Sequence, residues 1–213
     1  MFSSFINKLK SELEKELPGV FAQEKMSPSN RSNGYVFPEN KMEAQQSSVL
    51  ILLYPKGSGI NTVLIERNKY NGAHSGQISL PGGKYEKSDK DLIETAIREA
   101  GEEIGIDRKK VKVIGKLSSL YVPVSNFQIL PVIGYLNNIP SFTPDPKEVN
   151  HLIDVKINDL FDPLNTKTEE LIRHNYRVTA PYFELGRHHV WGATAMILSE
   201  LREIMRNAKL ISA

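Results

Sequence analysis

The sequence predicts a mixed β-sheet between helices, an α/β or α+β sandwich. Two stretches rich in β-branched and aliphatic residues, 47–54 and 61–68, follow each other closely and indicate paired strands. The apolar residues of 92–104 recur with the period of an α-helix, and a last helical pattern begins at Gly192 after further strand candidates. This order of strands, helix, strands and helix is typical of a sheet covered by helices.

Size and composition suit one soluble domain. A chain of 213 residues can bury one substantial core, whereas two full domains would be cramped. Lysine and arginine exceed aspartate and glutamate by 27 to 25, and this net charge of +2 argues against a dedicated nucleic-acid-binding protein. The chain has no cysteine, which excludes disulfides, thiolate zinc sites and cysteine nucleophiles. We expect a cytoplasmic protein.

The N-terminus predicts an amphipathic helix followed by a loop. The apolar residues at helical spacing are Phe2, Phe5, Ile6, Leu9, Leu13 and Leu17. Lysine and glutamate interrupt this stretch, so it is not a signal peptide, and the apolar run 49–54 is too short to cross a membrane. We expect the helix to pack on its own domain or on a second copy, with a membrane-surface helix as the alternative. Residues 1–34 thus form an N-terminal helix and loop, and 35–213 form the main domain.

The central part predicts a hairpin, a glycine-dense loop and a helix in this order. The two first strands are joined by the turn PKGSGI, and the segment NGAHSGQISLPGGKYEKS then leads into the helix at 92–104. Ser88 and Asp91 have the spacing of a capping pair at its start, and Gly105 suits its end. The later strand candidates are VKVIGKL, FQILPVIGYL, HLIDVKI and RVTAPYFEL.

Three carboxylates lie on one side of the helix 92–104. Glu99, Glu102 and Glu103 stand at positions i, i+3 and i+4, so their like charges repel one another. Mg²⁺ or Mn²⁺ would relieve that repulsion and keep open positions for water and a substrate phosphate. Arg98 stands one turn before Glu102 and could orient its carboxylate by a bidentate contact. A solvated helix face with an internal ion pair is the alternative interpretation.

The surrounding segment resembles the Nudix box, a glycine, five residues, a glutamate, seven residues and then Arg-Glu-apolar-x-Glu-Glu-x-Gly-apolar. The matching residues are Gly83, Arg98, Glu99, Ala100, Glu102, Glu103, Gly105 and Ile106. Asp89 stands where the first glutamate is expected, and eight residues separate it from Arg98. Both departures are similar to the coenzyme A pyrophosphatase branch of the Nudix hydrolases.

That branch also has a leading motif rich in arginine and glycine. The stretch LIERNKYNGAHSGQISLPGG is similar to it and keeps Arg67, Gly76, Pro81, Gly82 and Gly83. Gly72 replaces an arginine of the motif, Leu80 replaces a phenylalanine and Asn68 also departs from it. TPDPKEV, with Glu148, and HVWGATA also resemble the branch, so the resemblance covers roughly residues 22–205.

The resemblance implies a Nudix-type α/β/α sandwich around a mixed sheet, with the N-terminal helix as an addition. It implies metal-dependent hydrolysis of a diphosphate linked to a nucleoside, with Glu99, Glu102 and Glu103 as ligands of Mg²⁺ or Mn²⁺. Glu102 and Glu148 are candidates for the general base, and Arg98 completes the expected catalytic group. The expected substrate-binding residues are Arg67, Lys69, His74, Gly82 and Gly83.

Coenzyme A or a derivative, cleaved to 3′,5′-ADP and phosphopantetheine, is the substrate that the branch implies. A dinucleotide or an ADP-sugar is the alternative within the same chemistry, and a non-catalytic nucleotide sensor is the alternative from another class. The partner we expect is therefore a small nucleotide, with neither nucleic acid nor membrane, and a homodimer is possible.

The remaining histidines do not predict a metal site. His188 and His189 are adjacent and would point to opposite faces of a strand, so shared ligation of a metal is not expected. His74 lies in the glycine-rich loop, where a phosphate contact and an ordinary loop position are both compatible with the pattern.

Overall fold

The computed structural model describes residues 2–29, 44–68, 76–173 and 176–212. Its centre is a mixed sheet in the order β3-β2-β1-β7-β5. In addition, β4 pairs with β1, β8 pairs with β2, and β6 pairs with β7. The bounds are β1 Gln45–Lys56, β2 Gly59–Arg67, β3 Ile78–Ser79, β4 Gly82–Lys84, β5 Lys112–Lys116, β6 Leu120–Val122, β7 Phe127–Tyr135 and β8 Val149–Lys156. The predicted hairpin is confirmed, because β1 and β2 are antiparallel neighbours.

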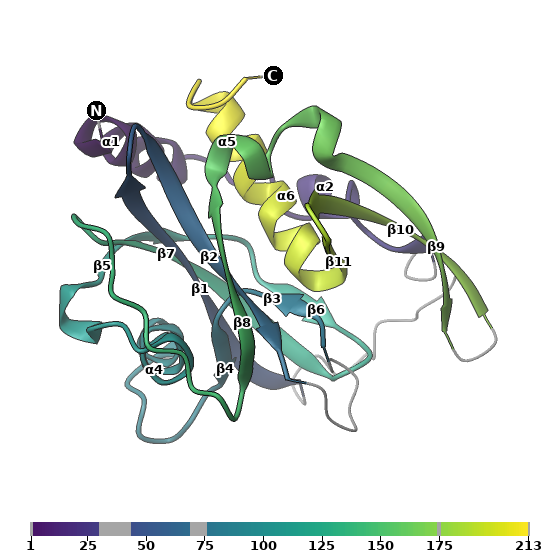
Figure 1. Ribbon diagram of the computed structural model, residues 1–213, viewed down its shortest axis with the longest axis horizontal. Coiled ribbons are helices and arrows are strands. Elements are labelled where there is room, and N and C mark those ends of the chain that lie inside the picture. Colours follow the sequence, from purple (N-terminus) through teal and green to yellow (C-terminus); the bar gives the residue numbers. More distant parts are fainter. Residues whose placement is uncertain (1, 30–43, 69–75, 174–175, 213) are drawn as a thin grey trace.

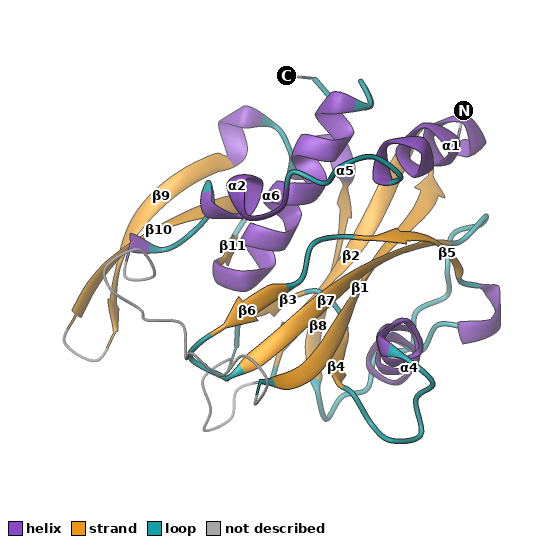
Figure 2. Cartoon of the chain, turned by 180° about the vertical axis from the view of Figure 1, so that it is seen from behind, coloured by secondary structure: helices purple, strands orange, loops and turns teal. Residues whose placement is uncertain are grey.

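The sheet is mixed because β1 runs parallel to β7 and antiparallel to β2 and β4. Strand β1 is apolar along most of its length since helices cover both faces. Leu50 and Leu52 pack toward the helix α4 (Leu92–Ile104), whereas Ile51 and Leu53 belong to the core on the other side. The sandwich that the sequence predicts is thus confirmed, and Figures 1 and 2 show α4 across the sheet from the C-terminal helix α6.

Helix α6 (Gly192–Asn207) shares its face of the sheet with the N-terminal part of the chain. Helix α1 (Phe2–Leu13) buries Ile6 and Leu9 in that core, so it packs on its own domain as expected. It ends earlier than Leu17, the last residue of the predicted pattern, and Pro18 keeps Leu17 itself out of a helical conformation. A short helix that we did not predict, α2 (Gly19–Glu24), follows and contacts α6.

A second, three-stranded antiparallel sheet stands beside the first (Figure 1). It consists of β9 (Thr166–Arg173), β10 (Tyr176–Leu185) and β11 (His188–Trp191). The sequence predicted only β10 of these as a strand. The short helix α5 (Ile157–Leu160) and a 3-10 turn at Pro163–Asn165 lead into it, and another such turn, Arg108–Lys110, precedes β5. No helix in the described part of the chain is long and apolar enough to span a bilayer.

Candidate active site

Helix α4 is the element that carries the acidic motif. Its N-cap is Asp91, whose carboxylate accepts hydrogen bonds from the backbone N–H groups of Ile93 and Glu94, while Glu94 reaches back to the N–H of Lys90. The predicted pairing of Ser88 with Asp91 was therefore wrong by three residues, because Asp91 is itself the capping residue. Gly105 ends the helix in the left-handed conformation, as predicted.

The turn at Gly82 and Gly83 passes close to this helix, and a side chain at either position would overlap a neighbour. Gly82 has a φ of 155°, and a side chain on it would overlap the backbone of β1. A Cβ on Gly83 would overlap the carboxylate of Glu99. The two glycines thus bring the backbone of β4 against the acidic face of α4.

Glu103 points inward rather than to solvent, and only 1% of the residue is exposed. Its Oε2 accepts a hydrogen bond from the N–H of Gly82 at 2.7 Å, and its Oε1 lies 3.3 Å from Nη1 of Arg67. Burial raises the pKa of Glu103 to about 7, with further increases from Glu148 and Glu99, although Arg67 and the Gly82 N–H oppose the shift.

Glu99 is half-buried beside Glu103 and is also affected by neighbouring charge. Burial raises its pKa, and the carboxylates of Glu102 and Glu148 add to the increase, whereas Arg98 lowers it. Since Glu148 raises the pKa of both Glu99 and Glu103, the structure brings these three carboxylates into one electrostatic cluster.

Arg98 joins the helix to the loop before it. Its Nε and Nη2 lie 2.8 and 3.1 Å from the two carboxylate oxygens of Asp89, and Nη2 also donates to the carbonyl of Lys84 at 2.9 Å. Glu99 and Glu102 each lie 3.0 Å from the guanidinium. We had expected Glu102 to be the bidentate partner of Arg98. The structure shows that this partner is Asp89. The sequence showed Asp89 only as a departure from a motif, and its role required the fold.

Asp89 is buried, and hydrogen bonds from Arg98 hold its pKa far below the ordinary value. The N–H of Glu86 and the hydroxyl of Thr95 donate to its Oδ2 as well. A buried carboxylate with so many donors is ionised and fixed, which makes it an anchor for Arg98 rather than a reactive group.

Glu148 lies at the end of an exposed turn, 146–148, just before β8. The N–H of Asn68 donates to the carbonyl of Glu148 at 3.0 Å, and the side-chain amide of Asn68 donates to the carbonyl of Pro146 at 2.8 Å. These bonds tie the turn to the end of β2, where Arg67 also lies. The loop position that the sequence predicted for Glu148 is confirmed.

Comparison with known proteins decides the family. Residues 44–173, more than half of the chain, match the family model of the NUDIX domain. The chain belongs to the Nudix hydrolase family. A Nudix hydrolase from Pectobacterium atrosepticum, NudL, described as uncharacterized, is 32% identical over 75% of this chain and 82% of its own length.

Two further relatives extend the comparison. "Nudix hydrolase 15, mitochondrial" of Arabidopsis thaliana is 33% identical over 75% of this chain, and the human "Mitochondrial coenzyme A diphosphatase NUDT8" is 32% identical over 62%. The chain spans 58% and 57% of the length of these two proteins. The crystal structure of a Nudix hydrolase from M. smegmatis, RenU, aligns with 76% of this chain and 87% of its own at a TM-score of 0.51 and 15% identity, which confirms the fold.

The donor set of this Nudix site fits a hard divalent cation of the kind that the family uses. Glu99, Glu103 and Glu148 offer only carboxylate oxygens, and burial together with like charge disfavours the ionised forms of Glu99 and Glu103 until a cation is near. In the described part of the chain, no three acidic or imidazole side chains yet converge on one point. Arg98 and Arg67, which lie against Glu99 and Glu103, supply positive charge there instead.

The structure does not place every residue that the sequence predicted for the site. Lys69 and His74, expected to bind substrate, lie outside the described residues, as does Gly72. His188 stacks on His151, whereas the adjacent His189 stacks on Tyr182, so the two imidazoles have different neighbours.

Proposed function

We propose that this protein is a metal-dependent hydrolase of diphosphates linked to a nucleoside. The observation that supports it best is the pair of Glu99 and Glu103 against the Gly82–Gly83 turn, with Glu148 near enough for its charge to affect both. A bound Mg²⁺ or Mn²⁺ would neutralise substrate phosphate oxygens and lower the pKa of the attacking water. Glu99 and Glu103 would hold the cation, with Glu102 as a further ligand on the exposed side of α4.

Arg98 has a positioning role in this proposal. Because Asp89 and the Lys84 carbonyl hold its guanidinium in place, it fixes the directions of the Glu99 and Glu102 carboxylates. The Gly82 N–H fixes Oε2 of Glu103 in the same way. The fold thus prepares the carboxylates for a cation before it binds.

Glu148 is the better candidate for the general base. Its charge affects both Glu99 and Glu103, and it is exposed on a turn where it can reach a water molecule. Glu102 is held by the Arg98 guanidinium, so its carboxylate is less free to turn toward a water molecule. We expect Glu148→Gln to lower kcat far more than it changes KM, while Lys147→Gln, in the same turn, changes neither. An effect on KM alone would move Glu148 to substrate binding.

Coenzyme A, or a derivative of it, is the substrate that we propose, with 3′,5′-ADP and phosphopantetheine as products. The support is the sequence similarity to the human protein named a coenzyme A diphosphatase. Gly72 stands where the branch has an arginine, and Arg67 contacts Glu103, so less positive charge is available for the 3′-phosphate than in that branch. We therefore expect only a modest preference for coenzyme A over its 3′-dephospho form, within about tenfold to a hundredfold.

The test is turnover across a panel of diphosphates with and without Mg²⁺ or Mn²⁺. The panel contains coenzyme A, dephospho-coenzyme A, ADP-ribose and a diadenosine polyphosphate. We expect metal-dependent turnover and the highest kcat/KM for coenzyme A. If kcat/KM for coenzyme A is no higher than for dephospho-coenzyme A, the proposed substrate is wrong, although the protein can still be a diphosphate hydrolase. Nucleotide binding without any turnover would favour the alternative of a non-catalytic nucleotide sensor.

Glu103→Gln tests the metal site within the same assay. Losing one charged ligand should reduce turnover by about 10²-fold or more with the fold intact. Glu86→Gln removes an exposed carboxylate from the neighbouring loop and should leave turnover nearly unchanged. Near-normal turnover in folded Glu103→Gln protein would remove Glu103 from the metal site.

A further inference from the structure

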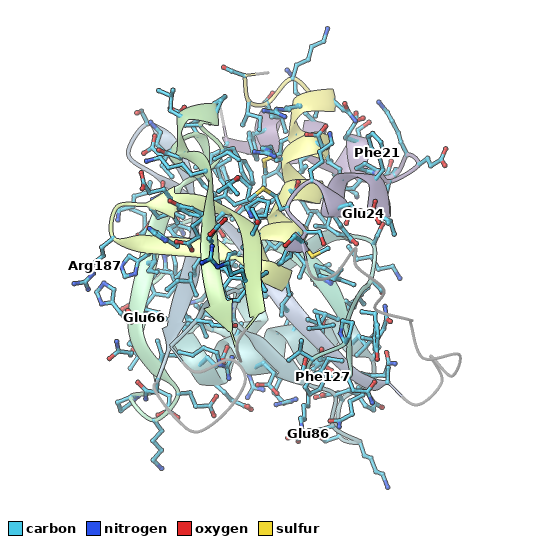
Figure 3. All side chains as sticks on the ribbon, turned by 90° about the vertical axis from the view of Figure 1, so that its right-hand side faces the viewer. Phe21, Glu24, Glu66, Glu86, Phe127 and Arg187 are labelled. Atoms are coloured by element: carbon cyan, nitrogen blue, oxygen red, sulfur yellow. The ribbon has the colours of Figure 1, made fainter. Side chains whose placement is uncertain are left out.

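Arg67 is the last residue of β2 and reaches the acidic cluster from the strand opposite α4. Its Nη1 lies 3.3 Å from Oε1 of Glu103, and 26% of its side chain is exposed. The preceding residue, Glu66, lies on the side where Arg187 lies (Figure 3), and the register of β2 is irregular between Glu66 and Arg67. Arg67 is therefore a cation placed between a buried carboxylate and solvent.

The two arginines at this cluster are held very differently. Arg98 is fixed by Asp89 and by the Lys84 carbonyl, so it would stay in place if Glu99 or Glu102 turned away. Among the described residues, the ionic contact of the Arg67 side chain is with Glu103, and at 3.3 Å it is longer than a strong charge-assisted hydrogen bond. The Arg67 side chain can therefore leave Glu103 without breaking a second ion pair within the described residues.

The two oxygens of Glu103 have different partners, and this limits where a cation can bind. Oε2 accepts the Gly82 N–H, which the backbone of β4 fixes. Oε1 is the oxygen that faces Arg67. A divalent cation that takes Oε1 as a ligand needs the position next to it, and repulsion between the two positive charges then displaces the guanidinium.

We propose that Arg67 is an exchangeable counter-ion, which holds Glu103 in the metal-free protein and turns to the substrate diphosphate when the metal takes its place. This inference rests on the proposed function and adds a positioning residue to it. Because metal binding frees the guanidinium that binds the diphosphate, metal and substrate should each increase the affinity for the other.

The test is the affinity for Mn²⁺ alone, measured by calorimetry on wild-type protein, Arg67→Gln and Arg187→Gln. Removing the competitor should tighten Mn²⁺ binding by about fivefold or more in Arg67→Gln, the low end of typical coupling between sites. Arg187→Gln removes a guanidinium from an exposed turn and should leave the affinity nearly unchanged. Weaker Mn²⁺ binding in Arg67→Gln, or equal tightening in both variants, would overturn the exchange.

A second measurement tests the coupling. With the methylene-bridged analogue α,β-methylene-ADP, Mn²⁺ should bind wild-type protein at least about fivefold more tightly than without it, and this gain should disappear in Arg67→Gln. An undiminished gain in the variant would contradict the role of Arg67. If wild-type protein binds no Mn²⁺ at all, the metal site of the proposed function fails, and the exchange with it.

A third measurement uses wild-type protein only and does not depend on the folding of a variant. In ¹⁵N-labelled protein, the Arg67 side-chain Nε signal should shift during titration with Mg²⁺, as the guanidinium leaves Glu103. The Arg98 signal should retain slow hydrogen exchange, since Asp89 still holds it. An Arg67 signal that does not change while Mg²⁺ saturates the site would overturn the proposal.

Discussion

Glu103 is a carboxyl group that the fold keeps away from water, and its titration affects stability. Its pKa is 4.5 in an unexceptional environment and about 7 in the folded protein. Between these values the unfolded chain releases a proton that the folded chain retains. The contribution of Glu103 to the free energy of unfolding of the metal-free protein should therefore be largest below a pH of about 4.5. It should be lost as the pH rises from there through about 7.

We expect this loss to be on the order of 3 kcal/mol, judged from a shift of this size. Denaturant unfolding in EDTA at a series of pH values measures it. Glu103→Gln cannot titrate, so its unfolding free energy should change less with pH than that of the wild type in this window. Parallel curves for the two proteins would contradict the raised pKa.

Gly83 provides a second test at the scale of one residue, because a methyl group there would overlap the Glu99 carboxylate. Gly83→Ala should displace Glu99 and reduce kcat by about tenfold to 10²-fold with little change in the melting temperature. Gly101→Ala is the matched control on α4, since its methyl meets the Arg108 side chain, which is exposed and can move. It should keep normal turnover, and equal losses in both variants would contradict a specific role for Gly83.

At the scale of elements, the ion pair between Asp89 and Arg98 fastens the loop before α4 to the helix. Both side chains are largely buried, so removing one charge leaves the other without a counter-ion. Asp89→Asn should lower the unfolding free energy by about 3 kcal/mol and reduce kcat, because Arg98 would no longer fix Glu99.

Asp107→Asn is the control for this change. Asp107 is an exposed cap of the 3-10 turn after α4, and its loss should lower the melting temperature far less than Asp89→Asn does, with normal turnover. If Asp89→Asn behaved like Asp107→Asn in thermal unfolding and in kcat, the anchoring role of Asp89 would be wrong.

At the scale of the whole molecule, the N-terminal helices are part of the same core as the sheet. Glu200 of α6 is fully buried and accepts hydrogen bonds from the Gly19 N–H, the Gln23 side chain and the Ser118 N–H. It therefore connects α2 and the loop before β6 to the C-terminal helix (Figure 2).

Glu200→Ala should therefore destabilise the entire protein by about 3 kcal/mol or more, because it leaves several buried donors without an acceptor. Urea unfolding should remain a single transition at a lower midpoint. Glu203→Ala, which removes a partly exposed carboxylate from the same helix, should cost less. A separate early transition in Glu200→Ala would show that residues 1–34 unfold independently of the main domain.

The spacing of residues along the sequence was sufficient to predict those helices and strands whose formation depends on residues close together in the chain. The period of the apolar residues predicted α1, α4 and α6, the β-rich stretches predicted the hairpin and most long strands, and the spacing of Glu99, Glu102 and Glu103 predicted the acidic face. The strands β3, β4 and β6 are two or three residues long, too short for any period to show, and they exist because neighbouring strands pair with them.

Only the tertiary structure decided the partners within the site. Spacing along α4 could not tell that Glu103 turns inward to the Gly82 N–H, or that Arg98 takes Asp89 as its bidentate partner. It also could not place Arg67 and Glu148 beside the helix, because they come from the ends of β2 and the turn before β8. A helix specifies which of its own side chains share a face, whereas burial, pKa and ion pairing depend on which distant segments the folded chain packs against that face.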